Sequence, residues 1–103
     1  MSKVTAECII SSDEGDKVIQ MEISGDGGGY GKNYLNEIVG DYAFHLGHFD
    51  REDDPRRGKA NASILLWESG RDLSESAELS PGESTNLSLR KARMDVVHEP
   101  LHS

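Results

Sequence analysis

The stretch that most constrains the fold is residues 77–89, AELSPGESTNLSL, because apolar residues alternate on both sides of a Pro-Gly corner. The alternating apolar positions are Ala77, Leu79, Leu87 and Leu89. Alternation with a period of two places one face of each arm against a core, and Pro-Gly turns the chain between the arms. This pattern is typical of the hairpins of β-sandwiches and β-barrels.

The corner also resembles a known motif. A leucine–Pro-Gly-Glu–leucine corner occurs in many immunoglobulin-like sandwich domains, antibody variable domains among them, and residues 77–89 are similar to it over 13 of 103 residues. In the antibody version a cysteine stands where this chain has Leu89. The resemblance implies a β-sandwich.

The N-terminal part predicts a hairpin. Residues 4–11 alternate Val4, Ala6, Cys8 and Ile10 on one face. Residues 17–24 place Ile19, Met21 and Ile23 opposite Gln20 and Glu22. The Gly/Asp-rich segment between the two runs favours a tight antiparallel connection.

In the middle of the chain, the sequence predicts a short helix followed by a strand. Tyr34, Leu35, Ile38 and Val39 lie at helical spacing between an N-cap at Asn33 and a glycine at Gly40, which predicts a short helix. The alternation over residues 41–49 predicts a strand. Phe49 breaks this alternation, so we expect a bulge near Gly47.

The second half predicts two further sheet segments. The apolar run 64–67 is typical of a strand covered on both faces. Residues 84–97 indicate one long arm with a second bulge where the apolar phase slips between Leu89 and Ala92.

These patterns predict one domain spanning residues 1–103. Its class is all-β: a small antiparallel β-sandwich or flattened barrel of about six strands, with one short helix. The core positions that we expect are Ile10, Ile19 or Met21, Phe44, Leu65, Trp67, Leu87 and Met94.

The charge, the apolar segments and the single cysteine of the chain argue against several classes of function. A formal charge of −8 argues against electrostatic capture of nucleic acid or of an anionic membrane. No apolar segment approaches the length of a membrane span, and the N-terminus has no apolar signal core. The single cysteine, Cys8, lies in an apolar run, which indicates a buried, unreactive thiol. A cytoplasmic location is the expectation.

Three residues form a ligand-like group. Two histidines and a carboxylate, here His45, His48 and Asp50, suit zinc or iron. On a regular strand the two histidines point to opposite faces, so a shared ion requires the bulge near Gly47. Side chains at the surface, flanking a loop, are the favoured interpretation.

The glycine-rich segment 25–31 has neither the P-loop spacing nor the dinucleotide-binding spacing. Glycines still admit a partner's backbone closely, and Tyr30 would anchor such a contact. The partner-binding residues that we expect are Gly28, Gly29, Tyr30 and Lys32.

Because no catalytic constellation stands out, the sequence favours a non-enzymatic binding or interaction module: an accessory, inhibitor or assembly protein that binds a protein partner through loops on a β scaffold. No cofactor and no nucleic-acid or membrane partner is expected. One alternative is a small cupin-like metal-dependent enzyme that uses His45, His48 and Asp50. The other is an acidic inhibitor that mimics nucleic acid. The uncharged run 60–67 favours a homodimer, formed by strand addition or by face packing.

Overall fold

The computed structural model describes residues 2–25, 32–49 and 53–100, and every helix or strand among them is a β-strand. The strands are β1 (Ser2–Ile10), β2 (Lys17–Gly25), β3 (Lys32–Val39), β4 (Tyr42–Phe49), β5 (Ala60–Glu68), β6 (Arg71–Leu79), β7 (Ser84–Leu89) and β8 (Ala92–Pro100). The all-β class is confirmed, with eight strands instead of about six. No helix in these ranges is long and apolar enough to cross a membrane.

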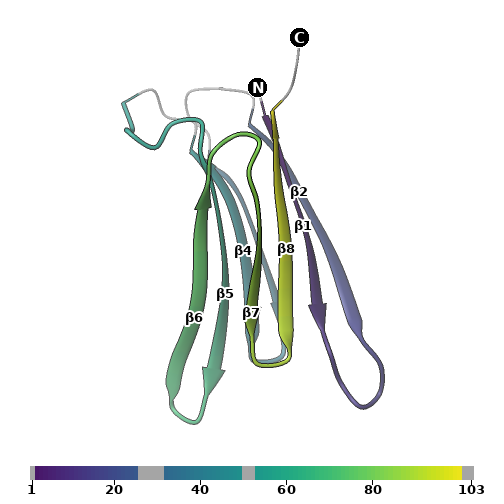
Figure 1. Cartoon of the computed structure of the whole chain (residues 1–103). Helices are drawn as coiled ribbons and strands as arrows, with labels where there is room; N and C mark the ends of the chain where they lie inside the picture. The colour runs from purple at the N-terminus through teal and green to yellow at the C-terminus, as the bar shows by residue number, and fades with distance from the viewer. Residues whose placement is uncertain (1, 26–31, 50–52, 101–103) are drawn as a thin grey trace.

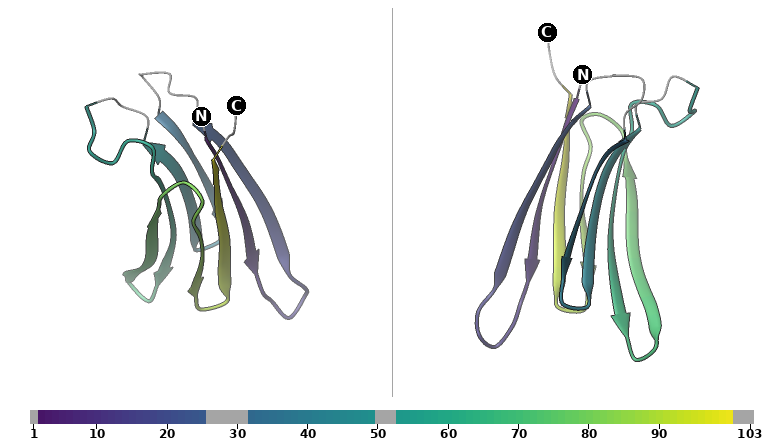
Figure 2. Two further views of the ribbon diagram at one scale, coloured as in Figure 1. Left: turned by 45° about the horizontal axis from the view of Figure 1, so that its top comes forward. Right: turned by 180° about the vertical axis from the view of Figure 1, so that it is seen from behind.

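The strands form two four-stranded antiparallel sheets that pack face to face (Figure 1). One sheet has the order β2-β1-β8-β7 and the other the order β3-β4-β5-β6. Consecutive strands follow one another around the molecule, and β8 pairs with β1. The result is a flattened ring that is open at β2/β3 and at β6/β7, and Figure 2 shows the two layers from two further sides. The predicted sandwich or flattened barrel is confirmed.

The core lies between the two sheets, where the inward side chains of each strand meet. The buried apolar cluster consists of Val4, Ala6, Cys8, Met21, Phe44, Leu46, Ala60, Ala62, Ile64, Leu79, Leu87, Ala92, Met94 and Val96. Met21, Phe44, Leu87 and Met94 were predicted core residues. Ile10 and Ile19 pack against the cluster and are partly buried. The prediction is wrong for Leu65 and Trp67, which are exposed.

Cys8 lies in this core, as expected for a thiol in an apolar run. Its Sγ is 3.7 Å from Met21 Sδ. Burial, with a smaller contribution from nearby carboxylates, raises the pKa of Cys8 to about 12. The thiol therefore stays protonated at physiological pH and is a poor nucleophile.

The predicted N-terminal hairpin is confirmed. β1 and β2 pair along their whole length, from Ser2 opposite Gly25 to Ile10 opposite Lys17. The predicted helix between Asn33 and Gly40 is wrong, since this segment is β3 and pairs with β4 from Lys32 to Val39. Tyr34 and Ile38 lie on one face of this strand and Leu35 and Val39 on the other. Together the two pairs have the sequence spacing of an amphipathic helix.

Neither predicted bulge is present. β4 keeps an unbroken register through Gly47, which lies opposite Tyr34 on one side and opposite Asn61 on the other. Phe49 faces outward, where the guanidinium carbon of Arg56 lies 4.1 Å from the centre of its ring. Phe49 therefore stays on the outer face of a regular strand, where Arg56 of the following loop covers its ring. No bulge turns Phe49 toward the core.

The predicted long arm over residues 84–97 is a hairpin. β7 ends at Leu89 and β8 begins at Ala92, and these two residues pair across a turn that contains Arg90 and Lys91. Arg90 has a positive φ of 55°, which is uncommon for a residue with a side chain. A two-residue turn shifts the apolar phase as a bulge would, so the sequence pattern did not distinguish the two.

The Pro-Gly corner connects the sheets. β6 belongs to one sheet and β7 to the other, so the arms on either side of the corner are not hydrogen-bonded neighbours. The Glu83 N–H donates to the Ser80 carbonyl at 3.0 Å, and the Ser80 N–H donates to Glu83 Oε1 at 2.5 Å. Gly82 takes a φ of 91°. The predicted turn is confirmed, while the predicted hairpin is wrong.

Candidate functional site

The candidate site is the outer face of the sheet β3-β4-β5-β6, which we call the β3–β6 face. Its described side chains project away from the core in a regular register across the four strands. They are Tyr34, Asn36 and Ile38 of β3, Ala43, His45 and Phe49 of β4, Asn61, Ser63, Leu65 and Trp67 of β5, and Asp72, Ser74, Ser76 and Glu78 of β6, with Gly47 on β4.

An apolar band crosses one end of this face. Ile38 lies opposite Ala43, and Ala43 lies opposite Leu65, so three strands contribute one continuous row. Ile38 is 77% exposed, Leu65 is 41% exposed and the neighbouring Trp67 is 54% exposed. Clusters of large, exposed apolar side chains are common at interaction sites of proteins in general, which makes this band the candidate binding surface.

The centre of the face is polar but uncharged. Tyr34 lies opposite Gly47, and its ring centre is 5.9 Å from that of His45. The Nδ1 atom of His45 is hydrogen-bonded to Asn36 Oδ1 at 2.8 Å. Because this carbonyl oxygen can only accept, Nδ1 carries the proton. Partial burial lowers the pKa of His45, so the ring is neutral at physiological pH.

Gly47 allows two of these polar groups to approach the sheet. A Cβ at this position would collide with Asn61 Oδ1 and would closely approach His45 Nε2. The two side chains therefore lie over the bare backbone between them. With Tyr34 across the strand pair, they form a shallow polar surface beside the apolar band.

Charges are confined to the margin of the face. Although 29% of the residues of the chain are charged, the described outward positions of β4 and β5 include no Asp, Glu, Lys or Arg. The charged side chains nearest to them are Asp72 and Glu78 on the edge strand β6. Glu78 is paired with Lys59 at 3.4 Å. Depletion of charge at the centre and polar residues at the rim are the composition of a protein interface.

The structure does not bring together His45 and His48, two of the three predicted metal ligands. His45 lies on the outer side of β4, whereas His48 is buried on the inner side. The His48 ring packs edge-on against the His98 ring, with the centres 5.3 Å apart. Asp50 lies outside the described residues. Among residues that the structure describes, no group of three or more His, Cys, Asp or Glu side chains could hold a metal ion.

The predicted partner-binding loop falls mostly outside the description. Gly28, Gly29 and Tyr30 belong to residues 26–31, and only Lys32 is placed, as the first residue of β3 opposite Phe49. The segment joins β2 to β3, so it leads directly into the edge of the β3–β6 face.

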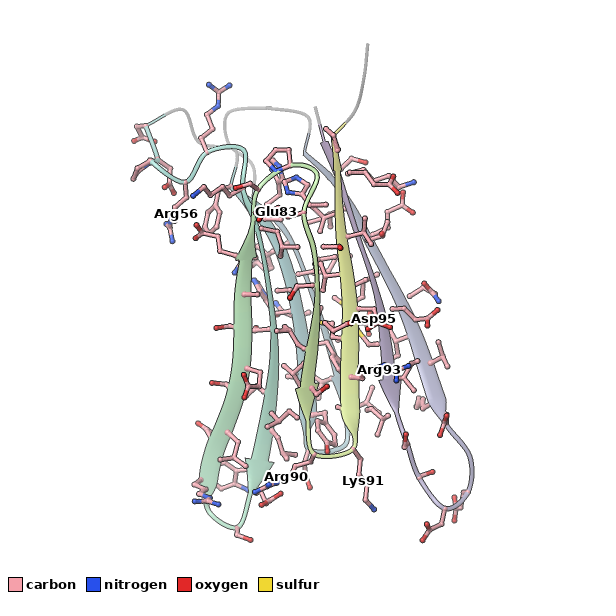
Figure 3. All side chains as sticks on the ribbon, viewed as in Figure 1. Arg56, Glu83, Arg90, Lys91, Arg93 and Asp95 are labelled. Atoms are coloured by element: carbon pink, nitrogen blue, oxygen red, sulfur yellow. The ribbon has the colours of Figure 1, made fainter. Side chains whose placement is uncertain are left out.

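A cavity of about 630 Å³ opens at the end of the sandwich next to the apolar band. Trp67 lines it, together with Tyr42, whose hydroxyl accepts a hydrogen bond from the Lys91 N–H at 3.1 Å. Arg90 makes two hydrogen bonds of 3.2 Å to the carboxylate of Glu68. Arg90 and Lys91 occupy the turn at the lower end of β7 and β8 in Figure 3. These contacts tie the two sheets together.

Sequence reasoning missed the residues that define this face. Leu65 and Trp67 were assigned to the core and Ile38 to a helix, because a continuous apolar run does not reveal which of its faces is covered. The absence of charge over residues 60–67 was the signal in the sequence that could have identified this face.

Comparisons with protein-family models, with curated proteins and with solved structures find no match for this chain. What the chain does is therefore inferred from its own surface.

Proposed function

We propose that this chain is a non-enzymatic interaction module that binds a protein partner through the β3–β6 face. The observation that carries the proposal is the apolar band of Ile38, Leu65 and Trp67, which is exposed on the uncharged part of an otherwise highly charged chain. Aromatic and large aliphatic side chains of this kind supply most of the binding energy in protein interfaces.

The polar part of the face supports the same role. Asn36, His45, Asn61 and Ser63 offer neutral donors and acceptors beside the band. Neutral groups cost less to remove from water than charged ones, so a partner with matching polar groups can cover them. The loop that contains Gly28, Gly29 and Tyr30 enters β3 through Lys32 at the edge of the face, and we include these residues in the proposed contact.

The test compares two substitutions that differ in the face they occupy. Leu65 is 41% exposed on the central strand β5, and Val97 is 40% exposed on the central strand β8 of the other sheet. Immobilised wild-type chain, Leu65→Lys and Val97→Lys are exposed to extract of the native host, and captured proteins are quantified by mass spectrometry. A Tyr30→Ala chain serves as a third arm for the loop.

We expect Val97→Lys to retain the captured partner and Leu65→Lys to lose it, because an unpaired lysine would have to be buried on binding. Circular dichroism must show that both variants remain folded. Equal capture by both variants would refute the β3–β6 face as the binding surface.

A further inference from the structure

The pattern of side-chain sizes on the β3–β6 face identifies one occupant. In order across the four strands, the apolar row is Ile38, Ala43, Leu65 and Ser74. It therefore alternates large, small, large, small. Read in the opposite direction, the same row is small, large, small, large. If a second copy of the row is laid over the first in this reversed order, each large side chain therefore meets a small one.

A two-fold axis that runs along the strands, between β4 and β5, produces this reversal. Such an axis lays β4 of one copy over β5 of the other and β3 over β6. Leu65 then meets Ala43 of the other copy, and Ile38 meets Ser74. Two sheets packed in this aligned way lie about 10 Å apart, with their side chains interdigitated.

The next two rows follow the same rule. In the row Asn36, His45, Ser63 and Ser76, the two-fold axis opposes His45 to Ser63 and Asn36 to Ser76. In the row Tyr34, Gly47, Asn61 and Glu78, it opposes Gly47 to Asn61 and the Tyr34 hydroxyl to the Glu78 carboxylate. A donor thus faces an acceptor at the margin, and a larger side chain faces a smaller one nearer the centre.

We infer that the partner on the β3–β6 face is a second copy of this chain, joined by face-to-face packing about this two-fold axis. The inference rests on the proposed function, since it names the partner of the same face. An interface in which one surface patch meets itself is the commonest route to a closed dimer.

Charge favours the same occupant. Two copies of a chain with a formal charge of −8 repel each other. They approach with the least repulsion where both surfaces are uncharged, and the described outward residues of β4 and β5 provide such a surface.

The size of the β3–β6 face also suits a dimer interface, because four strands of about eight residues form a face of roughly 19 by 27 Å. With side chains standing on it, that face carries roughly the 800 Å² that each partner buries in a standard interface.

Packing by faces is favoured over strand addition at the edges of this sheet. Glu37 on β3 lies opposite the buried Phe44, and Glu75 on β6 lies opposite the buried Ile64, so both glutamates occupy inward register positions. Both edge strands therefore carry an exposed, inward-facing charge. Such charges block the addition of another strand. For this sheet, the structure therefore favours face packing over strand addition, the two modes of dimerisation expected from the sequence.

The experiment measures the mass and dissociation constant of the full chain by sedimentation velocity and light scattering between about 1 and 500 μM. We expect twice the chain mass of 11.3 kDa at the upper concentrations. Leu65→Lys should weaken dimerisation by about 100-fold or more, because each dimer buries two unpaired lysines. Ile38→Lys, at a position that is 77% exposed in the single chain, is a second variant with little risk to folding. Val97→Lys is the matched control and should dimerise as the wild type does.

A size exchange tests the two-fold axis itself. Ala43→Leu alone should weaken the dimer by about tenfold or more, because it places leucine against leucine, and Leu65→Ala alone should weaken it by leaving a gap. The double variant Ala43→Leu/Leu65→Ala restores large against small and should recover most of the affinity. Failure of the double variant to recover would overturn the proposed axis.

The two proposals fail in different ways. A wild-type chain that remains a monomer at 500 μM overturns the homodimer. If capture of a different protein still depends on Leu65, the interaction module survives without it. If dimerisation is abolished by Val97→Lys and not by Leu65→Lys, the β3–β6 face is the wrong surface for both proposals.

Discussion

The two outer faces of the sandwich differ in charge, although the sheets beneath them have the same number of strands and the same antiparallel pairing. On the central strands β1 and β8, five of eight outward positions are charged: Lys3, Glu7, Arg93, Asp95 and Glu99. On the central strands β4 and β5 none of the described outward positions carries Asp, Glu, Lys or Arg. A water-facing sheet is expected to resemble the first face.

Side chains on the charged face satisfy one another. Lys3 is paired with Glu22 at 3.1 Å across β1 and β2, and Arg93 with Asp95 at 3.6 Å along β8. Figure 3 labels Arg93 and Asp95 on this strand. The Gln20 amide donates to Glu7 at 2.9 Å. Because these groups are already paired and hydrated, covering them would be costly. Under the proposed function, the face of β1 and β8 would stay in solvent and the β3–β6 face would bind the partner.

The first prediction concerns two adjacent residues on opposite sides of β5. Ile64→Ala removes a fully buried side chain and should lower the free energy of unfolding by about 2–4 kcal/mol. Leu65→Ala, one residue away, should cost less than about 1 kcal/mol in the monomer because Leu65 is exposed there. Urea unfolding at low micromolar concentration measures both. Equal losses would mean that Leu65 is covered within the single chain, and the comparison of faces would fail.

This adjacent pair also marks the limit of sequence reasoning. Alternation with clear polar and apolar faces was sufficient to predict β1, β2 and their pairing. It also identified four of the buried core residues: Met21, Phe44, Leu87 and Met94. In the run Ile64-Leu65-Leu66-Trp67 every residue is apolar, so periodicity carries no information about which face is covered. The face of β5 that becomes buried is the one against which the second sheet packs, and this depends on the tertiary structure.

The other errors have the same origin. In β3, large apolar residues occupy both faces of an edge strand, and their spacing matched a helix until pairing with β4 was known. The phase shift at Arg90 and Lys91 matched a bulge because strand pairing is a long-range property. The candidate face consists of side chains from four strands, so no local motif could have identified it.

The second prediction concerns the layer that both sheets share. The His98 side chain is fully buried beside His48, and its Nδ1 is 3.2 Å from the Leu79 carbonyl. Burial is the main cause that lowers the pKa of His98; nearby His48 acts in the same direction, while the Leu79 and Ser80 backbone and Glu83 oppose it. The folded state therefore binds fewer protons than the unfolded state below an unfolded pKa of about 6.5.

The stabilising contribution of neutral, buried His98 to the free energy of unfolding should therefore be fully present above about pH 6.5. It should decrease as the pH falls from there toward the lowered pKa of His98. Denaturant unfolding at pH 7.5, 6.0 and 5.0 measures the loss, and His98→Phe should reduce this pH dependence. His45, whose pKa is lowered on the outer face, requires a His45→Gln control. A stability that rises between pH 7.5 and 5.0 would contradict the assignment.

The third prediction concerns the effect of salt on dimerisation. If two acidic copies meet at an uncharged face, salt screens their repulsion without weakening the contact, so dimerisation should tighten by a few-fold between about 20 and 300 mM NaCl. An interface on the charged face would instead need ion pairs between the two copies, formed by charged side chains such as Lys3 and Glu22, and salt would weaken those pairs. Sedimentation equilibrium at both salt concentrations distinguishes the two.

The smallest effect is expected on the charged face itself. Asp95 accepts a 2.6 Å hydrogen bond from the Asn86 amide and pairs with Arg93, yet both contacts are open to solvent. Asp95→Ala should therefore cost about 0.2–1 kcal/mol of stability, since exposed ion pairs contribute little and the loss of one negative charge offsets part of the cost. Unfolding measured with and without 0.5 M NaCl should show this cost shrinking in salt. The dimer constant should stay within about twofold of the wild type, because the substitution lies on the opposite side of the sandwich from the proposed interface. If Asp95→Ala produced a monomer while Leu65→Lys left the dimer intact, the roles of the two faces would be reversed, and the absence of charge on β4 and β5 would need another physical cause.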